Sequence, residues 1–255
     1  MAFVRPAVTT LFLWFCFLGG FCLGGWLLFL VAGLSRGRRG LGWALAISTR
    51  AFIGVLRRVI PGLRLNLPAR AELRRSRGMV VVCNHLSFLD PLLLLARLPD
   101  LITIVRPDFL RIPVFGWLLR SAGFLGPDLF AQGRPWLDRV ACHLRRGGNL
   151  LIFPEGTRSR DGELGPFKKG AFYLARHLRA PILVLRIDGT HHVFARGRLT
   201  FDTTADRQID LRQLAIVTAA EAADLTSSQL ASHVRTLIAS EQATGCTQAP
   251  RAPAR

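Results

Sequence analysis

Met79-Val80-Val81-Val82-Cys83-Asn84-His85-Leu86-Ser87-Phe88-Leu89-Asp90 is the stretch that sets the fold class. Its first five residues form a continuous apolar run rich in β-branched side chains, which is typical of a buried strand in a largely parallel sheet. Residues 91–96, mostly leucine, predict the body of a helix. His85 therefore falls in the turn beyond the carboxyl end of a strand, where open α/β sheets bind their ligands.

The spacing of His85 and Asp90 suggests a catalytic pair. Residues five apart do not share one face of a regular helix. A turn at residues 86–87 would instead bring the carboxylate of Asp90 to one imidazole nitrogen of His85. Such a contact would fix the tautomer of the ring and leave the other nitrogen available as a base.

The same residues also fit an ordinary helix start. Asp90 could be the N-cap with Pro91 at the first helical position. Ser87 could equally be the N-cap, with Asp90 at the third position as in a capping box. The motif alone does not distinguish a helix start from a catalytic pair.

A second polar motif follows a second predicted strand. Residues 149–153 (Asn-Leu-Leu-Ile-Phe) predict another buried strand, and Pro154-Glu155-Gly156-Thr157-Arg158-Ser159-Arg160 comes directly after it. Glycine allows a backbone to approach a ligand closely, and arginine presents a planar fork that suits phosphate oxygens. The alternative is a solvated, charged turn without a ligand.

The two motifs, in this order and at this spacing, resemble the glycerolipid acyltransferase family, typified by bacterial 1-acylglycerol-3-phosphate acyltransferase. The resemblance extends from residue 79 to residue 190 and includes four further blocks, at residues 109–117, 121–124, 166–171 and 180–185. Together with the strand and helix patterns, it predicts an α/β fold with a mostly parallel sheet flanked by helices.

The resemblance implies a role for each matching residue. His85 would be the general base that takes a proton from an acceptor hydroxyl, and Asp90 would orient and support the imidazolium. Glu155, Gly156, Thr157 and Arg158 would shape the acceptor pocket, with Arg158 as the phosphate partner. The implied donor is acyl-CoA or acyl-carrier protein, and no metal or cofactor is expected. The implied acceptor is a lyso-lipid, foremost 1-acylglycerol-3-phosphate, which would give phosphatidic acid.

One position departs from the family pattern. Leu129 stands where the family usually has an arginine thought to bind the acceptor phosphate. Arg106, Arg120 and Arg134 are candidate substitutes. The departure leaves another lysophospholipid or a lyso-ornithine-type lipid open as the acceptor.

The N-terminal part of the chain predicts association with a membrane. Residues 8–34 are almost uninterrupted apolar sequence, long enough to span a bilayer, although two glycine pairs also permit a re-entrant hairpin. We therefore expect a hydrophobic anchor at residues 1–35. Arginines follow it at positions 36, 38 and 39, which predicts location in the cell inner membrane with the catalytic domain facing the cytoplasm. Residues 36–67 predict an amphipathic membrane-surface segment, or alternatively a helix packed on the domain.

The remaining expectations concern charge and the C-terminal part. The formal net charge of +18 suits an anionic membrane surface or the phosphates of the donor. No nucleic-acid-binding motif accompanies the charge, so nucleic acid is not an expected partner. A catalytically silent, basic membrane-binding protein is the alternative of another class.

The catalytic domain is expected at residues 68–241, closed by one helix at residues 219–241, with a disordered tail at 242–255.

Overall fold

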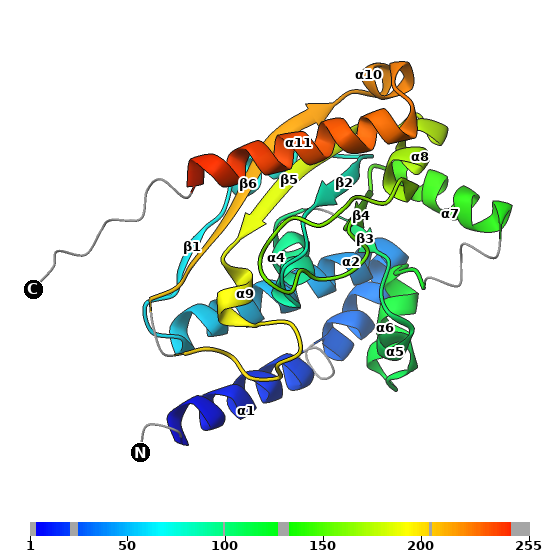
Figure 1. Cartoon of the computed structure of the whole chain (residues 1–255). Coiled ribbons are helices and arrows are strands. Elements are labelled where there is room, and N and C mark those ends of the chain that lie inside the picture. Colours follow the sequence, from blue (N-terminus) through cyan, green and yellow to red (C-terminus); the bar gives the residue numbers. More distant parts are fainter. Residues whose placement is uncertain (1–3, 21–24, 99, 127–132, 204–205, 246–255) are drawn as a thin grey trace, which may run out of the picture.

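The computed structural model describes residues 4–20, 25–98, 100–126, 133–203 and 206–245. Its centre is a six-stranded sheet in the order β1-β6-β5-β2-β4-β3 (Figure 1). All neighbouring strands are parallel except β5 and β6, which are antiparallel. The predicted α/β class with a mostly parallel sheet is therefore confirmed. The strands are β1 (Arg64–Asn66), β2 (Val80–Cys83), β3 (Leu101–Thr103), β4 (Asn149–Ile152), β5 (Ile182–Asp188) and β6 (Gln208–Val217).

Helices cover both faces of the sheet because alternate residues of each central strand point to opposite faces. Val81 and Cys83 face one apolar cluster, and Val80 and Val82 face the other. The first cluster packs under α1 (Val4–Gly19), α2 (Gly25–Val59), α4 (Leu89–Arg97) and α6 (Phe115–Ala122). The second packs under α7 (Arg134–Arg145), α8 (Gly170–His177), α10 (Ala219–Asp224) and α11 (Ser227–Gly245). Short helices complete the fold: α3 (Arg70–Leu73), α5 (Pro107–Arg111) and α9 (Thr190–Val193).

The predicted strands at residues 79–83 and 149–153 are confirmed as β2 and β4, and the leucine-rich helix is α4. Since β2, β3 and β4 are mutually parallel, their carboxyl ends lie at one edge of the layer. Residues 84–90 and 153–160 leave the sheet at that edge. The fold alone thus brings the two polar motifs together.

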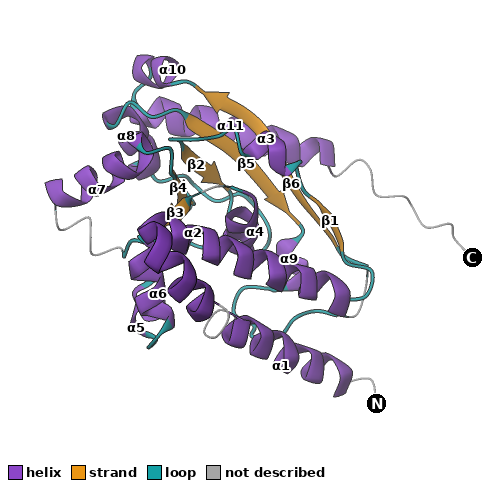
Figure 2. Cartoon of the chain, turned by 180° about the vertical axis from the view of Figure 1, so that it is seen from behind, coloured by secondary structure: helices purple, strands orange, loops and turns teal. Residues whose placement is uncertain are grey.

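The N-terminal part forms two helices, α1 and α2, seen side by side with the domain behind them in Figure 2. The predicted boundary between anchor and surface segment, at residues 35 and 36, falls inside α2. Buried residues of α2, among them Leu45, Phe52 and Leu56, belong to the core, so this helix packs on the domain. Among the described residues, no helix combines the length and the apolar character needed to cross a bilayer. The anchor stays a prediction.

Strand β1 and helix α11 cross two of the predicted domain boundaries, and the predicted closing helix is divided in two. Strand β1 lies within the predicted surface segment, so the sheet already begins at residue 64. The single closing helix is wrong: α10 ends at Asp224, and Thr226 caps a separate helix by exchanging hydrogen bonds with Gln229. Helix α11 then runs to Gly245, beyond the predicted start of the tail, whose residues 246–255 lie outside the described part.

Candidate active site

His85 and Asp90 form the contact that their spacing suggested. The Nδ1 atom of His85 lies 2.8 Å from Oδ2 of Asp90. The side chain of Asp90 is fully buried, whereas that of His85 is 18% exposed and stacks on Phe153 at the end of β4. No hydrogen bond to Nε2 of His85 is formed by the described residues. Because a carboxylate accepts, Nδ1 carries the proton and Nε2 presents a free lone pair toward the opening.

The start of α4 matches neither predicted helix start in full, because Phe88 is its N-cap residue and Leu89 its first helical residue. The backbone N–H of Ser87 donates to Oδ2 of Asp90 at 2.7 Å. This is the hydrogen bond that the third helical residue of a capping box accepts. The Ser87 hydroxyl accepts from the N–H of Leu89 at 3.3 Å and donates to the carbonyl of Phe194 at 2.7 Å. Asp90 itself is not the N-cap, since α4 begins at Leu89. The capping interaction and the catalytic pair therefore share one carboxylate.

The second motif holds the backbone of His85 from both sides. The N–H of His85 donates to Oε1 of Glu155 at 2.8 Å, and its carbonyl accepts from the N–H of Ser159 at 2.8 Å. Oε2 of Glu155 accepts from Gly165 at 3.2 Å. Burial raises the pKa of Glu155, against the effect of these two N–H donors. Glu155 thus fixes the loops around the site instead of pointing toward a ligand.

Gly156 and Thr157 form the exposed tip of the second motif. Gly156 has a φ of +71°, and a Cβ there would come within 2.7 Å of Nζ of Lys168, so the turn requires glycine. Its N–H closes the turn by donating to the carbonyl of Phe153. This turn directs the following residue, Arg158, back over the site.

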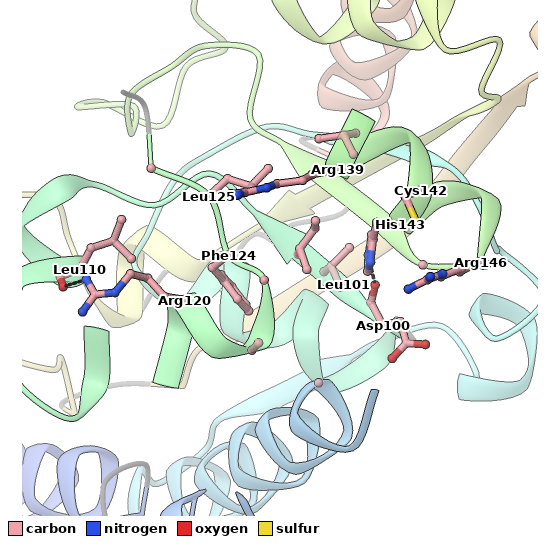
Figure 3. A pocket seen from close by; sticks show the side chains of 17 residues that line it. Asp100, Leu101, Leu110, Arg120, Phe124, Leu125, Arg139, Cys142, His143 and Arg146 are labelled. Carbon is pink, nitrogen blue, oxygen red and sulfur yellow. Dashed lines mark hydrogen bonds between the residues drawn. The ribbon is translucent and has the colours of Figure 1, made fainter. Parts of the chain in front are cut away.

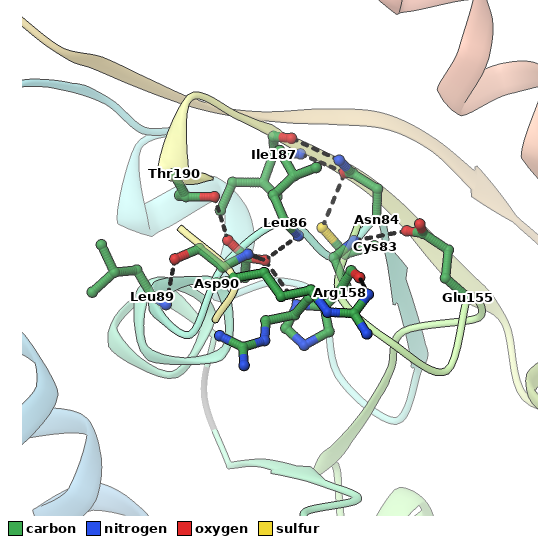
Figure 4. Close-up of polar contacts among 12 residues, drawn as sticks. Cys83, Asn84, Leu86, Leu89, Asp90, Glu155, Arg158, Ile187 and Thr190 are labelled. Atoms are coloured by element: carbon green, nitrogen blue, oxygen red, sulfur yellow. Dashed lines mark hydrogen bonds and ion pairs between the residues drawn. The ribbon is translucent and has the colours of Figure 1, made fainter. Parts of the chain in front are cut away.

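Arg158 lies in a concentration of positive charge beside the catalytic pair. Burial lowers the pKa of its guanidinium, and the nearby Arg196 and Arg106 lower it further, while Asp90 opposes them. Arg196 donates a hydrogen bond to the carbonyl of Arg158. Figure 4 shows Arg158 passing across the site near Asp90. With Arg196 and Arg106 close enough to lower its pKa, the half-buried guanidinium of Arg158 lies where an anion would be attracted, although Arg106 is also paired with Asp108.

Three contributors to the site were missing from the predicted set: Thr190, Asn84 and Arg196. The Thr190 hydroxyl donates to Oδ1 of Asp90 at 2.6 Å, and the Asn84 side chain exchanges two 2.8 Å hydrogen bonds with the backbone of Ile187 (Figure 4). Both contacts link the His85 loop to β5. Thr190 follows the carboxyl end of a central strand just as His85 does, so the same rule was available to identify it. Arg196 had no comparable signal.

Cys83 does not form a nucleophilic pair with His85. It is fully buried, and burial, followed by the charge of Asp90, raises the pKa of its thiol. Among the described residues, no three His, Cys, Asp or Glu side chains gather in a way that would hold a metal ion.

A pocket of about 440 Å³ opens elsewhere, beside edge strand β3. Figure 3 shows Leu101, Phe124 and Leu125 on its apolar wall and Arg139 and Arg146 near its rim. Asp100 and Gly148, which also line it, precede β3 and β4 and so mark the amino ends of these strands. None of the predicted site residues lines this pocket. The chemistry is therefore assigned to the carboxyl ends of the strands and not to this cavity.

The fold and the site define a class: an α/β domain with a hydrogen-bonded His–Asp pair at the carboxyl end of a central strand. Residues 64–188 match the family model described as Acyltransferase and form an acyltransferase-family domain. This match spans both motifs and the whole of β1 to β5. Together with the curated relatives and the solved structure described next, this match confirms the resemblance to the glycerolipid acyltransferases that the sequence indicated.

Curated relatives agree with this assignment. The chain is 37% identical over 121 residues to a chloroplastic 1-acyl-sn-glycerol-3-phosphate acyltransferase of Brassica napus, covering 46% of this chain and 35% of that one. It is 33% identical over 126 residues to the human beta form of 1-acyl-sn-glycerol-3-phosphate acyltransferase, covering 48% and 45% of the two chains. The chain thus spans less than half the length of these relatives.

A solved structure matches the fold over almost the entire chain. The crystal structure of the 1-acyl-sn-glycerophosphate acyltransferase PlsC from Thermotoga maritima superimposes with a TM-score of 0.78 and 22% sequence identity. The match covers 99% of this chain and all of that one. Because the match covers 99% of this chain, it includes the two N-terminal helices α1 and α2.

Proposed function

We propose that the protein transfers a fatty acyl group from a thioester donor to the free hydroxyl of a lyso-lipid, foremost 1-acylglycerol-3-phosphate. The observation that carries the proposal is the His85–Asp90 pair. Among the described residues, none forms a hydrogen bond to Nε2 of His85, and the second motif holds the backbone of His85 in place. The curated relatives bearing this activity by name support the same reaction.

The geometry accounts for each proton in the transfer. Nε2 of His85 takes the proton of the acceptor hydroxyl as its oxygen attacks the thioester carbonyl, forming a tetrahedral oxyanion. When this intermediate collapses, the carbon–sulfur bond breaks and the imidazolium returns the proton to the leaving thiolate. The carboxylate of Asp90 stabilises the imidazolium through the 2.8 Å contact with Nδ1. A positioned base of this kind contributes about 10²–10⁴-fold in rate.

The arginine cluster suits an acceptor with a phosphate headgroup. A phosphate dianion close to Arg158, Arg196 and Arg106 would relieve the repulsion that lowers the pKa of Arg158. Each guanidinium offers a fork of donors that matches phosphate oxygens. The positions of these side chains beside Asp90 would place the glycerol hydroxyl of the lipid near His85.

Arg106 is the best substitute for the arginine replaced by Leu129. Its charge reaches Arg158, whereas Arg120 donates to the carbonyl of Leu110 and lines the pocket at the sheet edge. Leu129 and the side chain of Arg134 lie outside the described part of the structure. Arg196 is a further candidate that the sequence had not indicated.

The acceptor and donor are amphiphiles, and we propose that the protein meets them at a membrane surface. Helix α1 buries one side against the domain yet exposes an apolar stripe on the other, with Leu11 at 70% and Phe15 at 73% exposure. Val8, Phe12 and Leu18 extend this stripe at helical spacing. Contiguous exposed apolar side chains of this kind mark membrane or protein contacts, and the net charge of +18 favours an anionic surface.

The first experiment measures thiol release from acyl-CoA, with 1-acylglycerol-3-phosphate compared with a panel of other lyso-lipids. We expect release with the phosphate-headed acceptor, loss of release in His85→Ala, and no change in His233→Ala, an exposed histidine on α11. Release with a different lyso-lipid alone would keep the mechanism and change the acceptor. Absence of release with acyl-CoA and with acyl-carrier protein would overturn the enzymatic proposal in favour of a silent membrane-binding protein.

The membrane proposal has its own test. The double variant Leu11→Ser, Phe15→Ser should reduce co-sedimentation with vesicles that contain anionic lipid, because two large apolar side chains leave the exposed stripe. Tyr173→Ser, which removes an exposed aromatic ring from α8, is the control. Equal binding of both variants would exclude the α1 stripe as the contact surface.

A further inference from the structure

The carboxylate of Asp90 accepts four hydrogen bonds, and their sources differ. Oδ2 accepts from Nδ1 of His85 and from the backbone N–H groups of Leu86 and Ser87, at 2.6–2.8 Å. All three donors come from the loop that carries Asp90 itself. Oδ1 accepts from the Thr190 hydroxyl at 2.6 Å, and Thr190 is its only donor among the described residues.

We propose that Thr190 is a positioning residue, which sets the carboxylate plane of Asp90 and through it the orientation of the His85 imidazole. The inference deepens the proposed function, on which its kinetic part rests. Thr190 touches neither substrate nor reacting atoms; it acts through Asp90.

Thr190 is itself held rigidly by the sheet. Its side chain is fully buried, and it opens α9 directly after β5. Gly189 before it has a φ of +81°, and a Cβ there would lie 1.9 Å from the carbonyl oxygen of Gln208 on β6. Asn84 ties the start of the His85 loop to Ile187 of the same strand by two hydrogen bonds. Strand β5 is therefore a common reference for both ends of the catalytic loop.

The need for this contact follows from the shape of a carboxylate. Three donors on Oδ2 hold that oxygen in place, but the carboxylate can still pivot about it, which moves Oδ1 and changes the direction in which the Oδ2 lone pairs face Nδ1. A fourth donor on Oδ1 prevents this pivoting. In a fully buried position no water replaces the Thr190 hydroxyl, so removing it leaves Oδ1 without a donor.

Thr190→Val and Thr190→Ser test the proposal with a matched control. Valine keeps the shape of threonine and removes the hydroxyl, while serine keeps the hydroxyl. Thr103→Val is the control. The hydroxyl of Thr103 is also buried, but it donates to the carbonyl of Leu151 at 3.0 Å and forms no hydrogen bond with Asp90. We expect Thr190→Val to lower kcat about 10- to 100-fold, the range for losing a hydrogen bond to a charged group, with little change in KM. Thr190→Ser should restore kcat, and Thr103→Val should leave it unchanged.

A spectroscopic measurement separates this contact from the proposed function. In protein labelled with ¹⁵N-histidine, the Nδ1–H proton shared between His85 and Asp90 is observable by NMR without any substrate. We expect its resonance to shift or broaden in Thr190→Val and to be retained in Thr190→Ser and Thr103→Val. Thr190→Ala gives a second variant without the hydroxyl should valine prevent folding.

The outcomes are distinguishable. An unchanged Nδ1–H resonance together with wild-type kcat in the folded Thr190→Val variant would overturn the proposal. Equal losses of kcat in Thr190→Val and Thr103→Val would also overturn it, because any buried hydroxyl would then have the same effect. A resonance that responds while no variant, wild type included, acylates a lyso-lipid would uphold the positioning contact and reject the proposed function.

Discussion

The loops that follow β2 and β4 lie at the same edge of the sheet and are built in opposite ways. Between residues 84 and 90, the side chains of Asn84, Ser87 and Asp90 are buried and hydrogen-bonded, whereas the side chain of His85 is partly exposed. Between residues 155 and 160, Glu155 is buried, whereas the tip at Gly156 and Thr157 and the side chain of Arg160 are exposed.

This difference separates catalysis from recognition. A general base must be held within a fraction of an ångström, which a buried and fully hydrogen-bonded loop achieves. A headgroup must enter from solvent or from a membrane, which requires exposed, charged side chains beside the base. Glu155 lies in the loop after β4, but its contact with the backbone of His85 makes it part of the support for the loop after β2.

The largest expected effect comes from breaking the rigid loop. Asp90→Asn replaces one accepting oxygen by a donating amide and disturbs both the tautomer of His85 and the capping of α4. We expect kcat to fall about 10²–10⁴-fold and the protein to lose stability, measured by thiol release and by urea unfolding. Asp138→Asn, at an exposed position on α7, is the control. Wild-type activity in Asp90→Asn would show that the contact is only a helix cap.

In the recognition loop, Arg158→Ala should weaken binding without weakening the fold. Its charge is unfavourable in the folded protein because of burial and the two neighbouring arginines, so its removal should not lower the free energy of unfolding. We expect KM for a phosphate-headed lyso-lipid to rise about 10- to 100-fold, as for a lost charge-assisted hydrogen bond. Arg160→Ala, two residues away and exposed, should change KM far less. Equal effects of the two variants would reduce the role of Arg158 to general surface charge.

Gly156→Ala tests how strongly the turn at residues 153–156 depends on glycine. The positive φ of Gly156 disfavours alanine, although the nearby end of Lys168 can move away. We expect a loss of about 1 kcal/mol in the free energy of unfolding. Gly170→Ala, at a helical position with no atom within 4 Å of the added Cβ, should be neutral or stabilising. Similar values for both would mean that the turn tolerates other conformations.

The smallest effect concerns the pH dependence caused by Glu155. Because burial raises its pKa above the usual 4.5, folding favours the protonated form of this carboxyl. Its contribution to stability is therefore full below pH 4.5 and is lost as the pH rises through the raised pKa. The difference in free energy of unfolding between wild type and Glu155→Gln should decrease over that interval and then level off. Urea unfolding of the two proteins from pH 4 to 8 measures this difference, and a constant difference over that interval would contradict the raised pKa.

Local sequence was sufficient for the elements that carry the chemistry. The run at residues 79–83 is continuous and apolar, and the run at residues 150–153 is aliphatic and aromatic, so both specify buried strands by themselves. His85 and Asp90 are five positions apart, and Oδ2 of Asp90 accepts only from donors within the same loop. For the same reason the contact between their side chains was predictable from spacing alone.

Elements that depend on distant partners were missed or misplaced. Strand β6 follows a polar segment and is stabilised by antiparallel pairing with β5, which a local pattern does not show. The apolar face of helix α2 would suit a membrane surface or the surface of a domain equally well. Its packing against the core shows that part of this face covers the domain. Leu225 and Thr226 interrupt an alanine-rich segment whose composition favoured one helix.

The sequence by itself determined the α/β class, the two motifs and the His85–Asp90 pair, because these rest on periodicity and on contacts within a few residues. Only the tertiary structure decided which groups surround them. Glu155 and Ser159 on the backbone of His85, Thr190 on Asp90, and Arg196 and Arg106 beside Arg158 join residues far apart in the chain. Such contacts depend on strand order, since β4 and β5 flank β2 on either side and bring their loops to it.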